Sequence, residues 1–163
     1  MTISVGDRIP EAQLMILGDD GPEEVSLYDK IQGQNVVIFG VPGAFTPTCT
    51  HSHFPSFIDN HKALRAKGVS KVICIAANDP FVLNAWALSL KSEEKNLLIL
   101  GDPDGEFIAK IGMEFSAPQA GLYKRSKRFS MYAVNGQVKI INIESEPGVC
   151  ELTSAETLLN QIH

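Results

Sequence analysis

The stretch Asn35-Val36-Val37-Ile38-Phe39-Gly40-Val41-Pro42-Gly43-Ala44-Phe45-Thr46-Pro47-Thr48-Cys49 sets a cysteine shortly after a short apolar segment. That segment, Asn35 to Phe39, is apolar and β-branched, which is typical of a buried strand. Thr46 is a favourable N-cap for a helix, and Pro47 suits the first helical position, where a missing N–H costs nothing. The stretch therefore predicts a buried strand, a turn and the start of a helix.

The predicted helix runs from Cys49 to Ala66, and its apolar side chains recur at roughly helical spacing: Phe54, Phe57, Ile58 and Leu64. With Thr46 as N-cap, Cys49 is the third helical residue and lies in the first turn. Unpaired backbone N–H groups and the positive end of the helix dipole lie there, and both favour a thiolate over a thiol. Cys49 is therefore a candidate nucleophile, although most free cysteines are small buried hydrophobes.

Three separated motifs resemble those of the peroxiredoxin family. Pro42, Thr46 and Cys49 match the family's peroxidatic motif, in which three residues separate the proline from the threonine and two separate the threonine from the cysteine. The surrounding stretch is similar to the type II, or peroxiredoxin-five-like, subfamily. The other two motifs follow in the right order, and the resemblance covers nearly the whole chain: Asn78-Asp79-Pro80-Phe81-Val82 and Arg125-Ser126-Lys127-Arg128-Phe129-Ser130-Met131.

The resemblance implies a thiol-dependent peroxidase that reduces hydrogen peroxide and small alkyl hydroperoxides to water and alcohols. The reaction would pass through a Cys49 thiolate and a sulfenic acid on the same sulfur, in the service of antioxidant defence and cell redox homeostasis. A thiolate that attacks a peroxide needs no metal or organic cofactor, and none is expected.

The chemistry requires groups that hold the peroxide in line and stabilise charge on the departing oxygen. Thr46 lies one helical turn before Cys49 and can hydrogen-bond both thiolate and peroxide. The resemblance implies that Pro42 shields the sulfur from water and that Arg128 stabilises the anion and the leaving oxygen. Sequence spacing alone does not separate Arg128 from Arg125, so Arg125 remains an alternative.

The pattern Cys49-x-His51-x-His53 also suggests a metal site. Residues two apart face different sides of a helix, however, so these three side chains cannot converge on one ion, and no metal site is predicted. The family resemblance instead implies that His53 orients the active-site loop or steers the substrate.

Aromatic and apolar residues are expected near the pocket. Phe45 is predicted to form a wall of the substrate pocket, whereas Phe81 is predicted to belong to the core. In relatives of this type, such residues form a small dimer interface around the pocket, together with the counterparts of Phe115 and Leu122. The resemblance therefore implies a homodimer.

The sulfenic acid on Cys49 must be resolved by a second thiol. Cys150 lies in a Gly/Pro-flanked loop, and Cys74 lies in an apolar strand. Because a loop moves more readily than a buried strand, Cys150 is the favoured resolving residue and Cys74 the second candidate. A third route needs neither, since glutathione or glutaredoxin could attack the sulfenic acid directly. The expected reductant is thus thioredoxin, or glutathione with glutaredoxin.

The composition narrows the class of protein. The chain has 163 residues, a net charge of −5 and three cysteines, an odd number that disfavours a structural disulfide framework. No apolar run suits a membrane span, and no secretory signal is visible. The acidic charge argues against a nucleic-acid partner. A cytoplasmic protein is expected, and an organelle after removal of a transit peptide remains open.

The remaining pattern predicts an α/β protein with the thioredoxin-like order of elements and extra N-terminal strands, in a single domain of residues 1–163. Asn135-Gly136 is a strong hairpin signal, and Thr153-Ser154-Ala155-Glu156 is a capping box. Strands are expected at residues 12–17, 24–27, 36–39, 71–77, 97–100, 129–134 and 137–143, and helices at 49–66, 80–91, 105–111 and 155–161.

Two other functions would use the same residues. In one, oxidised Cys49 relays a peroxide signal to a partner, as a redox sensor or binding protein. In the other, the protein is a thioredoxin-like adaptor with inert cysteines. The placement of Thr46 and Cys49 at a helix start argues against the adaptor, and turnover with a recycling thiol separates the peroxidase from the sensor.

Overall fold

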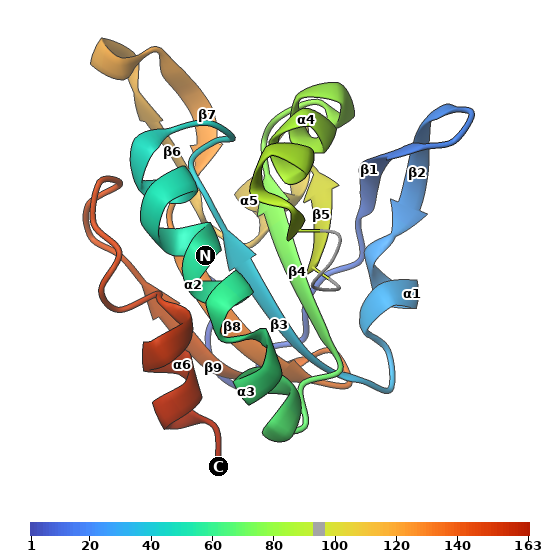
Figure 1. The fold of residues 1–163 in the computed structure, drawn as a ribbon, viewed down its shortest axis with the longest axis vertical. Helices are drawn as coiled ribbons and strands as arrows, with labels where there is room; N and C mark the ends of the chain where they lie inside the picture. The colour runs from blue at the N-terminus through green and yellow to red at the C-terminus, as the bar shows by residue number, and fades with distance from the viewer. Residues whose placement is uncertain (93–96) are drawn as a thin grey trace.

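A seven-stranded mixed sheet forms the centre of the computed structural model, which describes residues 1–92 and 97–163 (Figure 1). The strands lie in the order β2-β1-β5-β4-β3-β8-β9. Their bounds are β1 Gln13–Gly18, β2 Gly21–Ser26, β3 Asn35–Gly40, β4 Lys71–Ala76, β5 Leu97–Gly101, β8 Phe129–Val134 and β9 Gln137–Ile143. The predicted α/β class, with a thioredoxin-like core and added N-terminal strands β1 and β2, is confirmed.

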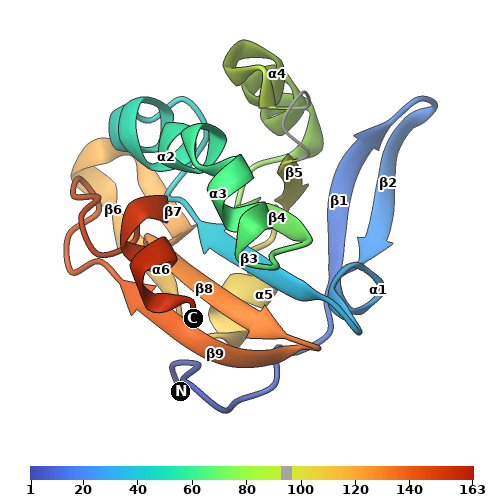
Figure 2. The same cartoon turned by 60° about the horizontal axis from the view of Figure 1, so that its bottom comes forward.

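Helices cover both faces of this sheet (Figure 2). On one face lie α2 (Phe54–Asp59), α3 (His61–Ala66), α4 (Pro80–Leu90) and α6 (Ala155–Gln161), whose apolar side chains share one core with β3 and β4. The other core includes α1 (Leu27–Ile31) and α5 (Glu106–Lys110). None of the helices that the structure describes is long and apolar enough to cross a membrane.

β3 lies near the middle of the sheet, parallel to β4 and antiparallel to β8. Alternate side chains enter opposite cores: Val37 and Phe39 pack with the α2 layer, and Val36 and Ile38 with the α5 layer. Burial on both faces explains why the segment is almost continuously apolar. The carboxyl end of β3, where parallel sheets commonly carry their sites, leads directly to Pro42.

The predicted helix over residues 49–66 is wrong in its continuity. A π-helical turn, η1 (Cys49–His53), precedes α2. α2 ends at Asp59, and the next residue, Asn60, has a φ of −106° and a ψ of 11° that interrupt the helix before α3. The π-turn has a local cause, because Pro55 has no N–H to offer the preceding turn and the Phe54 N–H bonds the carbonyl of Cys49.

Capping residues account for two further differences from the predicted boundaries. The strand expected at residues 24–27 ends at Ser26, because the Ser26 hydroxyl accepts the Asp29 N–H and opens α1. The capping box expected from Thr153 is wrong, since the cap of α6 is Ser154, which accepts the Thr157 N–H at 3.2 Å.

The hairpin of β8 and β9 agrees with the prediction to the residue, and Asn135 and Gly136 both have the positive φ that its tight turn needs. A second hairpin was not predicted. It joins β6 (Glu114–Ala117) to β7 (Leu122–Ser126) through a 3-10 turn, η3 (Pro118–Ala120), as a separate two-stranded sheet. Its largely exposed strands lack a clear apolar alternation, which is why pattern analysis passes over them.

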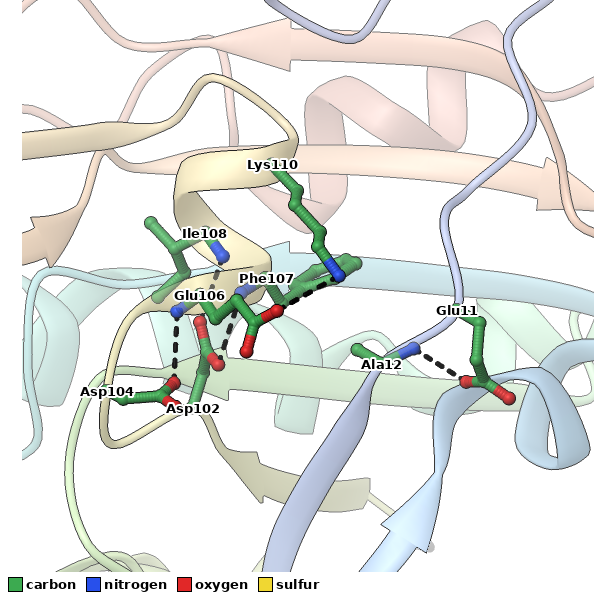
Figure 3. Close-up of polar contacts among 8 residues, drawn as sticks. All are labelled: Glu11, Ala12, Asp102, Asp104, Glu106, Phe107, Ile108 and Lys110. Carbon is green, nitrogen blue, oxygen red and sulfur yellow. Dashed lines mark hydrogen bonds and ion pairs between the residues drawn. The ribbon is translucent and has the colours of Figure 1, made fainter.

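Acidic side chains at α5 serve the backbone (Figure 3). Asp102 is buried and accepts the N–H groups of Phe107 and Ile108 at 3.3 and 2.9 Å, while burial raises the pKa of its carboxyl group. Asp104 accepts the Glu106 N–H at 3.0 Å. These carboxylates therefore act as caps of a short helix.

Candidate functional site

Cys49 follows the carboxyl end of β3 along the chain and lies in a helical segment that begins at Pro47. It is the third helical residue, as predicted, and its side chain is fully buried. The sulfur accepts a hydrogen bond from Nη2 of Arg128 at 3.2 Å. A guanidinium is a charge-assisted hydrogen-bond donor, and the sulfur that it contacts lies in the first turn of the helical segment.

Arg128 is the central polar residue of the site, although only 2% of its surface is exposed. Besides the Cys49 sulfur, it donates from Nη2 to the Pro147 carbonyl at 2.9 Å and from Nη1 to His53 Nδ1 at 3.0 Å. It immediately precedes β8, which pairs with β3, so sheet formation brings residues 79 positions apart into contact. Of the two arginine candidates, this pairing places Arg128 against the Cys49 sulfur.

Arg125, a residue of β7, contacts the turn that follows β3. Its Nη1 donates to the Pro42 carbonyl at 3.0 Å, and its guanidinium occupies the space that a side chain at position 43 would need. Gly43 is therefore required for this close approach. Arg125 holds the backbone of the turn, whereas Arg128 contacts the sulfur.

His53 is fully buried, and its two ring nitrogens have different partners. Nε2 lies 3.0 Å from the Thr153 carbonyl, which can only accept, so Nε2 carries the proton and Nδ1 accepts from Arg128. Burial, and then the charge of Arg128, hold the pKa of His53 well below its usual 6.5. The neutral ring therefore orients Arg128. His51 is exposed on the other side of the helix.

Thr46 precedes the first helical residue, but its hydroxyl does not cap the helix. It donates to the Gly43 carbonyl at 2.7 Å, and this hydrogen bond stabilises the turn of residues 43–46. With its proton engaged, the Thr46 oxygen has lone pairs left to accept a hydrogen bond from a bound molecule.

A cavity of about 320 Å³ opens beside these residues. Thr46 and Arg128 line it, together with Pro42, Pro47, Thr48, Ala120, Leu122, Pro147 and Gly148. The β6–β7 hairpin thus supplies part of one wall. Phe45, expected as a pocket wall, is 55% exposed, has a φ of 64° and is not among the lining residues of the single chain.

The segment of residues 145–153, here called the C-terminal loop, packs directly on the site. The carbonyl of Pro147 accepts from Arg128, that of Gly148 accepts from the Thr48 hydroxyl at 2.9 Å, and that of Thr153 accepts from His53. These contacts could not be predicted from the sequence, because they are made by backbone carbonyls, which every residue has.

The three cysteines are all free thiols. Cys74 is fully buried in β4 and packs in the same core as Cys49, while Cys150 is partly buried in the C-terminal loop, with its sulfur 3.8 Å from the Thr153 hydroxyl. Burial raises the pKa of the Cys74 thiol well above 9.0, and it also raises the pKa of Cys150. Among the residues that the structure describes, no guanidinium contacts either of these sulfurs as Arg128 contacts that of Cys49.

Several large apolar side chains remain on the surface. Phe81, predicted to be core, is 60% exposed, because α4 turns Leu83 and Trp86 inward instead. Phe45 and two further side chains, Tyr123 and Leu152, are also more than half exposed.

Comparisons with known proteins agree with one another. A family model described as Redoxin matches residues 4–159. Peroxiredoxin-2C of Oryza sativa subsp. japonica is 41% identical over 161 residues, 98% of each chain, and peroxiredoxin-2C of Arabidopsis thaliana is 38% identical over the same shares. Reduced Prx3 of Vibrio vulnificus, crystallised in complex with hydrogen peroxide, superposes with a TM-score of 0.90 at 36% identity, covering 99% of this chain and 100% of that one.

Proposed function

Because this chain belongs to the redoxin family and is a peroxiredoxin, a thiol-dependent peroxidase, we propose that Cys49 is the residue that attacks the peroxide. The observation that carries this assignment is the 3.2 Å contact between the Cys49 sulfur and the buried guanidinium of Arg128. Cys74 and Cys150 lack such a contact with a cation in the part of the chain that the structure describes.

In the proposed reaction the Cys49 thiolate displaces RO⁻ from ROOH, so that an S–O bond forms as the O–O bond breaks. The sulfur is oxidised and the peroxide is reduced. The peroxide proton stays on the oxygen bound to sulfur, giving a sulfenic acid, and the departing RO⁻ takes a proton from water to become water or an alcohol.

Two side chains support that step. The free lone pairs of Thr46 accept the hydrogen bond of the peroxide and hold its O–O bond in line with the sulfur. Arg128 stabilises the thiolate before attack and the negative charge on the departing oxygen during it. Pro42 lines the cavity beside them and helps to exclude water. His53 acts through Arg128, without touching the peroxide.

Cys150 is proposed as the resolving residue, ahead of Cys74. Its loop already contacts Arg128 and Thr48, so a local rearrangement of one loop would expose it to the sulfenic acid. Cys74 would require β4 to open within the sheet. Thioredoxin would then reduce the disulfide, or glutathione and glutaredoxin would reduce the sulfenic acid directly.

The assembly and the setting are also proposals. The exposed side chains Phe45, Phe81 and Tyr123 suit a homodimer contact, in which Phe45 of each subunit would close the partner's pocket. We propose that residues 1–163 act as one domain in the cytoplasm, in antioxidant defence, with a small hydroperoxide as substrate and no nucleic-acid partner.

The proposal is tested by adding one equivalent of hydrogen peroxide to the reduced protein and recording the intact mass with peptide mapping. Loss of two hydrogens, mapped to Cys49 and Cys150, supports both assignments. Loss of two hydrogens mapped to Cys49 and Cys74 supports the nucleophile and overturns the resolving residue. Gain of one oxygen on Cys49 indicates a one-cysteine cycle. An unchanged Cys49 overturns the assignment of the nucleophile.

A further inference from the structure

Glu144 lies directly across from Arg128, at the position after β9. Its backbone N–H donates to the Arg128 carbonyl at 3.0 Å, which extends the β8–β9 pairing by one step. Glu144 is only 6% exposed, and it has no role in the peroxide reaction proposed above. β9 ends at Ile143, and Figure 1 shows that a loop connects this strand to α6.

The Glu144 carboxylate fastens the far end of this loop. Oε1 accepts the N–H groups of Glu151 and Leu152 at 3.3 and 3.1 Å, and Oε2 accepts that of Thr153 at 2.9 Å. A single side chain therefore binds three consecutive backbone donors. Charge-assisted bonds of this kind are about twice as strong as neutral ones, and their burial strengthens them further.

The loop that Glu144 fastens supplies the acceptors that hold the catalytic arginine and its neighbour. The Pro147 carbonyl accepts from Arg128 at 2.9 Å, and the Thr153 carbonyl accepts from His53 at 3.0 Å. Thr153 thus contacts both side chains through its backbone: its N–H donates to Glu144, and its carbonyl accepts from His53. His53 in turn accepts from Arg128 at 3.0 Å. The chain of contacts runs from Glu144 through the loop to the guanidinium on the sulfur.

We propose that Glu144 is a positioning residue for peroxide reduction, which holds the C-terminal loop so that the carbonyls of Pro147 and Thr153 keep Arg128 against Cys49. The inference rests on the proposed roles of Cys49 and Arg128. It assigns Glu144 no contact with the peroxide. Its effect on the reaction passes through Arg128 alone.

The carboxylate form is required for this role. Glutamine at position 144 would keep one accepting oxygen but turn an NH₂ group toward at least one backbone N–H, and two donors cannot bond each other. The loop would then lose part of its attachment, and the two carbonyls would hold Arg128 and His53 less firmly. The change is nearly isosteric, so the apolar packing stays as it is.

Stopped-flow fluorescence of Trp86, the single tryptophan of the chain, gives the readout. Its Nε1 donates to the Thr50 hydroxyl at 3.1 Å, one residue from Cys49, so oxidation of Cys49 should change its emission. Glu144→Gln should lower the second-order rate constant with hydrogen peroxide about tenfold, the lower end of what changes to supporting residues cost at metal sites. Glu146→Gln, the same charge change on an exposed side chain of the same loop, should leave it unaltered.

The decisive comparison repeats the substitution in an Arg128→Met background. If Glu144 acts through the arginine, Glu144→Gln should lower the rate about tenfold in the wild-type chain and leave it unchanged in Arg128→Met. An equal loss in both backgrounds indicates a general structural role and overturns the proposal. A wild-type rate in Glu144→Gln overturns it as well.

Should Glu144→Gln fail to fold, Glu144→Asp carries the same test, because it keeps two carboxylate oxygens but withdraws them by one methylene. Its rate should fall by a smaller factor in the wild-type background only, and an unaltered rate overturns the proposal. Failure of the underlying function is distinct: Cys49 of the unsubstituted protein would then not react with peroxide, whatever residue occupies position 144.

Discussion

Cys49 and Cys74 are buried to the same extent and pack in the same core, yet their sulfurs have different polar surroundings. Both side chains are 0% exposed. Cys74 lies in β4, opposite Phe39 of β3 and Ile99 of β5, and burial raises the pKa of its thiol well above 9.0. Cys49 lies at a helix start with a guanidinium 3.2 Å from its sulfur.

The difference shows that two equally buried thiols can have different polar neighbours. Burial disfavours the charged form of any cysteine, and only specific partners reverse that effect. At Cys49 a guanidinium donates to the sulfur, which lies in the first turn of a helical segment. Cys74 has apolar strand neighbours, and burial and then the charge of the Cys49 sulfur raise the pKa of its thiol against a smaller opposing effect of Arg128.

The largest expected effect separates the two cysteines directly. Cys49→Ala should lower peroxide consumption with dithiothreitol as reductant by at least about a thousandfold, since removing a nucleophile abolishes the chemical step. Cys74→Ala should change the rate by less than about twofold, because it removes one sulfur from a core and costs stability alone. A large loss of rate in folded Cys74→Ala would break the comparison.

The next effect tests whether the cation makes the difference. Arg128→Met should lower the rate constant with hydrogen peroxide by about a hundredfold to a thousandfold, as the loss of a charge-stabilising donor does elsewhere. Alkylation of Cys49 by iodoacetamide at pH 7 should also slow toward that of an ordinary thiol. Arg125→Met removes one backbone hydrogen bond from the turn and should cost about tenfold or less. If Arg125→Met were the more damaging change, the roles of the two arginines would be reversed.

The smallest effect concerns the stability of the site. His53 is buried with a lowered pKa, so below pH 6.5 the unfolded chain binds a proton that the folded chain does not. The free energy of unfolding is therefore unaffected by this group above pH 6.5 and falls as the pH drops below it, by up to about 1.4 kcal/mol per pH unit.

Urea unfolding between pH 5 and pH 7.5 measures that dependence. His53→Gln should flatten the slope below pH 6.5, while His51→Gln, at an exposed position in the same turn, should keep it. An equal slope in the wild type and in His53→Gln would show that His53 titrates normally and does not serve as a neutral support for Arg128.

Local pattern proved sufficient for most of the secondary structure. The hairpin of residues 129–143, the helix at 155–161 and the strand leading to Pro42 are confirmed, because each has a strong short-range signal. The continuous helix over 49–66 and the Thr153 cap are wrong. Both failures have a specific cause. Pro55 has no N–H for the regular helical hydrogen bond, and the Thr153 N–H donates to the Glu144 carboxylate.

The burial of aromatic residues was less predictable. Phe45, Phe81, Phe54 and Phe57 are the same type of residue. Phe45 and Phe81 are nevertheless largely exposed, whereas Phe54 and Phe57 are fully buried. A single sequence does not distinguish an apolar residue that packs in the core from one that stays exposed and can contact a partner. Both follow the same hydrophobic pattern.

Residue types a few positions apart were enough to predict the fold class, the helical turn that holds Cys49 and, through three motifs, the family. The tertiary structure was needed to show that Arg128 and not Arg125 reaches the sulfur, that the pKa of His53 is lowered, and that Glu144 binds the C-terminal loop that packs on the site. Those contacts join residues up to 100 positions apart, several of them through backbone carbonyls, and only the pairing of strands and the packing of loops brings such atoms together.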